Sequence, residues 1–255
     1  MKAIINPFIF SQINLDSAEL TMLTSAVHKI AESGSYDGTI HRGADVVGRF
    51  RLAVSDMPPE KCVAESANQV NIDLKSLDLP SADQIESQSK NCFQVRTGGY
   101  IVFHISNGAG GYFVELKRTG SESGGKIVFD SRKLGEKDLF VATPLRPGKY
   151  SVTNIETKAK AELVVAYPEV GKIPKQPQAT KVECNQKEIE PEKIKINPTE
   201  PLLFSFKMPS RIKIELMKPE DRPRVIPQKK EAMQKSQTSK QATNRKPIRH
   251  LRINV

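Results

Sequence analysis

Short runs in which apolar and polar residues alternate dominate the chain and predict a mainly β protein. Between residues 92 and 167 these runs are separated by glycine-rich or polar turns at intervals of about 8 to 13 residues, the spacing of an antiparallel sandwich or barrel. No helical segment is available to cross over between parallel strands, so a βαβ unit does not fit. The expected strands cover residues 99–106, 111–117, 126–129, 138–141, 149–152 and 161–167.

One segment before this region has helical periodicity. Asp16 and Glu19 are three positions apart, as in a capping box, and Gly34 is a suitable helix end. Apolar residues recur between them at helical spacing: Leu20, Leu23, Val27 and Ile30. We therefore expect one N-terminal helix over residues 16–33, with His28 on its surface or boundary rather than acting as a ligand.

A β-hairpin is expected next. Residues 36–41 and 46–54 are rich in β-branched and aromatic residues, and residues 42–45 between them form a turn. Alternation from Phe50 onward places the arginines on the face opposite the apolar side chains. Two interpretations of these arginines stay open, an anion site and a solvated strand face: Arg42, Arg49 and Arg51. One further strand is expected at residues 70–74.

A short motif resembles a known group of folds. Residues 145–152 read Leu-Arg-Pro-Gly-Lys-Tyr-Ser-Val, which is similar to the turn and strand of immunoglobulin-like, transthyretin-like and cupredoxin-like sandwiches. The resemblance covers about 75 residues and concerns the fold rather than one family. It implies a tight turn at Pro147 and Gly148, with the Tyr150 ring between the sheets and its hydroxyl near the edge. Cupredoxins carry Cys, His and Met copper ligands after this turn, whereas residues 151–160 contain none, so we expect no blue copper.

The cysteines and histidines do not suggest a metal site or a disulfide framework. Cys62, Cys92 and Cys184 are odd in number and widely separated, as expected for reduced thiols packed as small hydrophobic groups. The histidines are equally scattered. We assign no catalytic residue, no metal ligand and no cofactor.

A small second β region follows a proline-rich linker. Its expected strands cover residues 181–184, 193–197, 202–206 and 211–216. In the last of these, Ile212, Ile214 and Leu216 alternate with charged residues, so one face is buried and the other is wet. A region of this size has too small a core to be stable alone, so we expect it to pack on the first sandwich or on a partner.

These patterns divide the chain into four expected regions. Residues 1–90 hold the N-terminal helix and hairpin, residues 91–170 the β-sandwich, and residues 171–217 the small β region. Residues 218–255 form a flexible basic tail, because they contain 11 basic and 3 acidic residues and little that can be buried. Residues 1–170 are close to neutral, so the sequence assigns the high isoelectric point to this tail rather than to a folded surface.

The tail ends in a short apolar and basic peptide that could dock to another protein. Leu251, Ile253 and Val255 lie on one side of an extended strand, and such a strand can add to an exposed sheet edge. Two readings stay open, a strand that docks in trans and one that returns to its own body or frays. The expected partner-binding residues are Ile248, Arg249, Leu251, Arg252, Ile253 and Val255.

The leading functional hypothesis is a non-catalytic structural or adaptor protein, held to a larger protein assembly by its basic tail. The first alternative is a hydrolase or ligand-binding enzyme on the same sandwich, with His104 near Asp130 or Glu115. The second is weak nucleic-acid binding by the tail, which lacks aromatic residues for base stacking. No run approaches the roughly 18 apolar residues of a membrane helix, so we expect no membrane span and a cytoplasmic protein.

Overall fold

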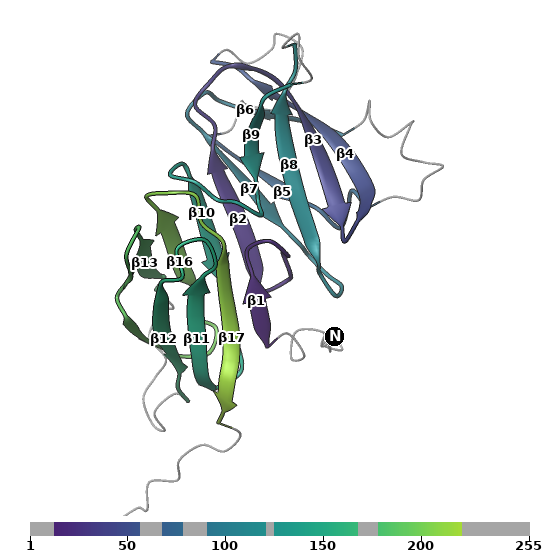
Figure 1. Ribbon diagram of the computed structural model, residues 1–255. Helices are drawn as coiled ribbons and strands as arrows, with labels where there is room; N and C mark the ends of the chain where they lie inside the picture. Colours follow the sequence, from purple (N-terminus) through teal and green to yellow (C-terminus); the bar gives the residue numbers. More distant parts are fainter. Residues whose placement is uncertain (1–12, 57–67, 79–90, 121–124, 168–177, 221–255) are drawn as a thin grey trace, which may run out of the picture. The chain divides into compact units, whose positions relative to one another are not determined.

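The computed structural model describes residues 13–56, 68–78, 91–120, 125–167 and 178–220. In these residues the regular structure consists of strands, arranged in three sheets (Figure 1). The chain divides into two units, Met1–Asp221 and Arg222–Val255. The second unit, which contains the expected docking peptide, lies outside the described residues.

Two of the sheets have five strands and one has seven, and each list below follows the order of strands across the sheet. The β3 sheet consists of β6 (Cys92–Val95), β4 (Asp45–Val54), β3 (Gly34–Arg42), β8 (Tyr112–Arg118) and β9 (Ile127–Asp130). The β11 sheet consists of β1 (Asn14–Asp16), β17 (Ile212–Pro219), β11 (Gly148–Asn154), β12 (Lys160–Val165) and β15 (Lys193–Ile196). The seven-stranded sheet consists of β14 (Ile189–Glu190), β13 (Thr180–Cys184), β16 (Leu202–Phe206), β10 (Asp138–Ala142), β2 (Thr24–Lys29), β7 (Tyr100–His104) and β5 (Gln69–Asp73).

The core lies on one face of the seven-stranded sheet. A single row of side chains in register crosses six of its strands: Ile72, Phe103, Ala26, Phe140, Phe204 and Val182. Phe103 stacks on Phe129 of β9 with ring centroids 5.1 Å apart, so the β3 sheet packs on this face. Buried residues of the β11 sheet, such as Val152 and Leu163, belong to the same apolar cluster. One continuous core therefore joins all three sheets.

The expectation of a mainly β fold is confirmed, but the sheets are not purely antiparallel. Four strand pairs are parallel: β4 with β6, β5 with β7, β12 with β15, and β13 with β16. Successive strands often belong to different sheets, so a strand arriving from another sheet can align parallel to its neighbour. Residues of the expected 171–217 region supply strands to both the β11 sheet and the seven-stranded sheet.

The expected N-terminal helix over residues 16–33 is wrong, and its residues form β1, a turn and β2. The capping signal is real, because the Asp16 carboxylate accepts a hydrogen bond from the Ala18 amide at 2.9 Å, but it closes a turn. In β2 the buried positions are Thr24, Ala26 and His28. The sequence pattern did not indicate this alternation of a strand, because small and polar side chains face the core while the apolar Val27 faces outward.

The expected hairpin and most later strands are confirmed. β3 and β4 pair through residues 34–54, and Gly43 takes a positive φ of 63° in the turn. Tyr150 also lies as the resemblance implies. It is 3% exposed, and its hydroxyl donates a hydrogen bond of 2.6 Å to the carbonyl of Arg146 across the Pro147 turn.

Candidate functional site

The outer side of the β11 sheet carries a group of lysines that we call the lysine face. Along each strand the side chains alternate, so residues such as Leu163 and Ile194 are buried while their neighbours point outward. Strands β11, β12, β15 and β17 contribute six lysines to this face: Lys149, Lys160, Lys193, Lys195, Lys213 and Lys218. Two glutamates from the same strands accompany them, Glu162 and Glu215, so the face is strongly positive.

The pairing of the strands brings these charges together. Lys149 on β11 lies directly opposite Lys218 on β17, and Glu162 on β12 lies opposite Lys193 on β15. Two residues further along the same two strands, Val164 on β12 lies opposite Lys195 on β15. Like charges opposite one another destabilise an antiparallel pair by a few tenths of a kcal/mol. The Lys149 and Lys218 pair therefore does not serve the stability of the sheet.

Only part of this charge is neutralised by the glutamates. Lys149 pairs with Glu162 at 3.4 Å, and Lys213 pairs with Glu215 at 2.7 Å. Four lysines of the face form no ion pair with a described residue: Lys160, Lys193, Lys195 and Lys218. These ammonium groups attract anions through a field that salt screens over about 10 Å.

A cavity of about 520 Å³ opens on the lysine face. Residues from β11, β12, β15 and β17 line it, among them Lys149, Lys160, Lys193 and Met217. Met217 is 69% exposed and has no partner in register, because a bulge separates it from the pairing of β17 with β11. The cavity therefore combines ammonium groups with the carboxylates of Glu162 and Glu192 and with one flexible apolar side chain.

The lysine face adds a local positive surface to the net positive charge that the sequence places in the C-terminal residues. The sequence assigned this charge to residues 218–255, since residues 1–170 are nearly neutral. A balanced count can still hide a charged surface when the two signs segregate between sheets. The alternation in β17 was predicted correctly, with Ile212 and Ile214 buried. The grouping of four strands was not predictable, because β12 and β15 are neighbours only in the folded sheet.

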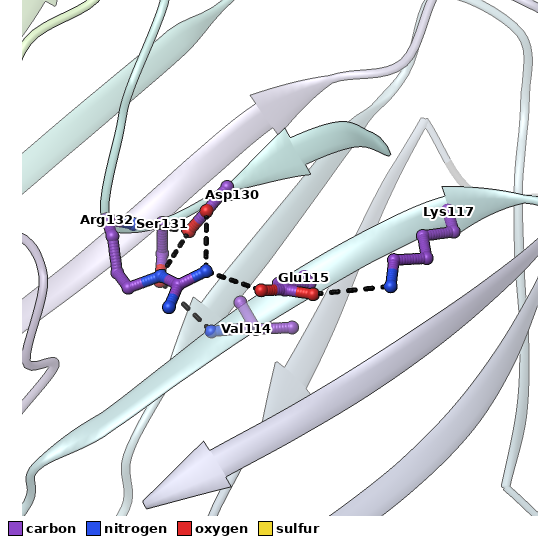
Figure 2. A network of polar contacts seen from close by, with 6 residues as sticks. All are labelled: Val114, Glu115, Lys117, Asp130, Ser131 and Arg132. Carbon is purple, nitrogen blue, oxygen red and sulfur yellow. Dashed lines mark hydrogen bonds and ion pairs between the residues drawn. The ribbon is translucent and has the colours of Figure 1, made fainter. Parts of the chain in front are cut away.

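The outer side of the β3 sheet is polar as well, but Arg51 and Lys117 on it each pair with a carboxylate. Figure 2 shows the Arg132 guanidinium between Asp130 and Glu115, with Lys117 on the other side of Glu115. Arg132 donates to the two Asp130 carboxylate oxygens at 3.0 and 2.9 Å. Its guanidinium also lies 4.2 Å from the centre of the Phe113 ring. These contacts fix Arg132 as a structural element of the β9 edge.

His41 borders this network in a cavity of about 530 Å³. Its ring stacks on Phe113 with centroids 4.4 Å apart, and its Nε2 atom is buried with no hydrogen-bond partner among the described residues. Burial lowers the pKa of His41, so its ring is neutral at pH 7. Carboxylates and cations both line the cavity, including Asp37 and Lys117.

The three arginines of the hairpin do not converge on one anion site. Arg49 and Arg51 are exposed on the outer side of β4, as the alternation predicted. Arg51 lies 3.8 Å from Asp37, and Arg42 lies 3.9 Å from Asp78. The interpretation as a solvated strand face therefore fits better than an anion site.

A buried histidine and aspartate pair lies in the seven-stranded sheet and was missed by sequence reasoning. His28 on β2 is opposite Asp138 on β10, and its Nδ1 is 2.6 Å from the Asp138 carboxylate. The second Asp138 oxygen accepts the Gly135 amide at 2.6 Å. Both side chains are less than a tenth exposed. The pair satisfies polar groups inside the core, whereas the sequence predicted His28 at the surface or boundary of a helix.

His104 does not meet the carboxylates that the enzyme alternative assigned to it. It ends β7 in the seven-stranded sheet, opposite Asp73 on β5. Glu115 and Asp130 belong to the β3 sheet, where both contact Arg132. The structure therefore does not assemble the expected catalytic pair.

The cysteines differ in their surroundings. Cys184 is buried, and its burial raises the pKa of the thiol to about 12. Cys92 is exposed at the start of β6. Among the described residues no three His, Cys, Asp or Glu side chains gather in a way that could hold a metal ion.

The expected partner-binding residues all lie in the second unit, outside the described residues: Ile248, Arg249, Leu251, Arg252, Ile253 and Val255. In the described part of the chain, no helix has the length and apolar character needed to cross a membrane. No family model, no curated protein and no solved structure matches the chain.

Proposed function

We propose that this chain is a non-catalytic structural or adaptor protein that joins a larger protein assembly through its basic C-terminal residues. One observation carries the proposal, the division of charge between the two units. Arg222–Val255 contains 10 basic residues and 1 acidic residue, whereas Met1–Asp221 contains 29 basic and 28 acidic residues. A segment of such uniform sign binds partners of the opposite sign and accelerates their association.

The lysine face, like the C-terminal unit, attracts a partner of negative charge. Lys218 belongs to this face and lies only four residues before Arg222, where the basic unit begins. Glu220 and Asp221 lie between them, so the chain has two positive regions separated by a short acidic step. An acidic protein surface is the partner that both would attract.

The last residues supply specificity in this proposal. Leu251, Ile253 and Val255 act as apolar anchors on one side of an extended strand, and Arg249 and Arg252 supply the electrostatic flank. Main-chain hydrogen bonds to the edge of a partner sheet would give affinity, while alternate side chains would set the register.

The test compares co-purification by the full chain with that by a chain lacking residues 247–255. Deletion is expected to release the partner while the body keeps its cooperative thermal transition. A triple substitution of Leu251, Ile253 and Val255 to serine should have the same effect, because it removes the anchors and keeps the charge. The matched control replaces Lys229 and Lys230 by glutamine, which lowers charge in the same unit and spares the peptide. Unchanged co-purification by the deleted chain and by the triple serine variant would reject the proposal.

Salt titration separates this function from nucleic-acid binding by the same residues. Binding to phosphate falls steeply and linearly in a plot of log affinity against log salt, with a slope set by the number of phosphates contacted. We expect the protein partner to be retained at a salt concentration that removes single-stranded and duplex DNA. Tighter retention of DNA than of the protein partner would favour the nucleic-acid alternative.

A further inference from the structure

β15 is an edge strand of the β11 sheet, and part of its backbone faces away from the sheet. It pairs in parallel with β12, and no described strand lies on its other side. The carbonyl of Glu192 accepts a hydrogen bond from the Glu162 amide of β12 at 2.7 Å, and the carbonyl of Ile196 accepts one from the Ala166 amide, directly after β12, at 2.9 Å. The N–H and C=O groups of successive residues in a strand point to opposite edges. Those of Ile194 therefore also point toward β12, whereas those of Lys193 and Lys195 point to the open edge.

The side chains of the same two residues belong to the lysine face. Lys193 and Lys195 are exposed, whereas Ile194 and Ile196 are buried in the core. Lysines at a sheet edge discourage uncharged strands from adding there. A strand with carboxylates at alternate positions is attracted to this edge instead, because each carboxylate would lie beside an ammonium group.

We propose that the edge of β15 receives an acidic extended protein segment, which adds to the β11 sheet as a sixth strand and places its carboxylates over the lysine face. This is a second contact, on the folded body, and it does not depend on the C-terminal residues. The cavity beside Lys160 and Met217 accepts side chains of the incoming segment. Main-chain bonds to Lys193 and Lys195 give affinity, and the lysines select the acidic sequence.

The chain's own C-terminal peptide is a poor occupant of this edge. Residues 247–255 contain no Asp or Glu side chain, so a strand formed by them would place no carboxylate side chain beside Lys193 and Lys195, and an arginine on that face would repel these lysines. The proposed occupant is therefore another protein whose extended segment is acidic.

The test uses the full chain and a synthetic peptide in which glutamate and valine alternate. Hydrogen exchange of single amides is measured by NMR with and without the peptide. The amides of Lys193 and Lys195 should exchange about tenfold more slowly on binding, because each gains a main-chain acceptor. The amide of Ile194 should change little, since it already faces β12. A peptide alternating lysine and valine is the control and should protect none of them.

Charge reversal tests the choice of face. The pair K193E/K195E should weaken binding of the acidic peptide about tenfold or more, since each reversal replaces attraction by repulsion. The matched control is K133E/K181E, which alters the net charge equally at exposed lysines outside the β11 sheet. The milder pair K193Q/K195Q should lower affinity by a smaller factor and serves if the reversed chain does not fold.

Several results would overturn this proposal. One is an equal loss of binding in the reversal and in its control, and another is peptide binding without protection of the Lys193 and Lys195 amides. Duplex DNA is the comparison ligand, and tighter binding of DNA than of the acidic peptide to the lysine face would assign the face to phosphate. Deletion of residues 247–255 should leave the protection of the Lys193 and Lys195 amides intact. Failure of the contact at β15 can therefore be distinguished from failure of the C-terminal contact.

Discussion

The hydroxyl of Tyr150 links the stability of the fold to pH, and replacing Tyr150 by phenylalanine tests the effect. The ring is 3% exposed, and the hydroxyl donates to the Arg146 carbonyl at 2.6 Å. Burial raises the pKa of Tyr150 to about 12, whereas an unfolded tyrosine has a pKa of 10.0. Below pH 10 the hydroxyl is protonated in both states, so this contribution to stability is fully present. Between pH 10 and 12 the unfolded chain releases its proton while the folded chain retains it.

The size of the effect follows from this separation. A difference of about two pKa units corresponds to about 2 to 3 kcal/mol, which the wild-type chain loses as pH rises from 10 through 12. At pH 8 the phenylalanine variant should be less stable by about 1 kcal/mol, the net value of one hydrogen bond. The variant has no phenol that titrates at this position, so the difference in the free energy of unfolding between the two chains should change sign at about pH 11.

The assay is urea unfolding followed by circular dichroism at a series of pH values from 8 to about 11.5. At each pH the free energy of unfolding of the variant is subtracted from that of the wild-type chain. This subtraction cancels the contributions of other titrating groups, because both chains contain them. Parallel stability profiles for the two chains would show that Tyr150 does not link stability to pH, and a variant more stable than wild type at pH 8 would show that its hydrogen bond does not stabilise the fold.

Three further predictions concern the core. Gly38→Ala should destabilise the fold by about 2 kcal/mol or more in urea unfolding, because an added Cβ would meet the Phe50 ring at 2.0 Å. Asp138→Ala should cost about 3 kcal/mol in the same assay, since it leaves His28 and the Gly135 amide without their buried acceptor; a cost below about 1 kcal/mol would contradict this. The Cys184 thiol, with a pKa of about 12, should react with a disulfide reagent at pH 8 only as fast as the protein unfolds, measured with the other two cysteines replaced by serine; fast reaction of the native protein would contradict its burial.

Local patterns were sufficient to predict most strands and one side-chain position. The hairpin of β3 and β4 followed from β-branched residues around a glycine turn, and the alternation in β17 gave its buried face correctly. The placement of Tyr150 followed from its motif. These features depend on neighbouring residues in the sequence, which a pattern can report.

The features that were missed depend on contacts between distant segments. β2 buries Thr24, Ala26 and His28, and only pairing with β7 and β10 explains why small and polar residues face the core. The capping pattern at Asp16 is shared by helices and turns, so it could not distinguish them. The lysine face requires the order of strands, because β12 and β15 are separated by some thirty residues and by strands of another sheet.

Cross-linking of the purified complex with a carbodiimide, which joins a lysine directly to a carboxylate, shows whether the lysine face and the C-terminal unit contact acidic residues of the partner. We expect partner carboxylates to become linked to lysines of Arg222–Val255 and to Lys160, Lys193 and Lys195 on the lysine face. We also expect Lys133 and Lys181, which are equally exposed on other surfaces, to stay unlinked. Links concentrated on those two lysines, with none on the lysine face or in the C-terminal unit, would contradict the claim that positive charge at these places joins the chain to its assembly.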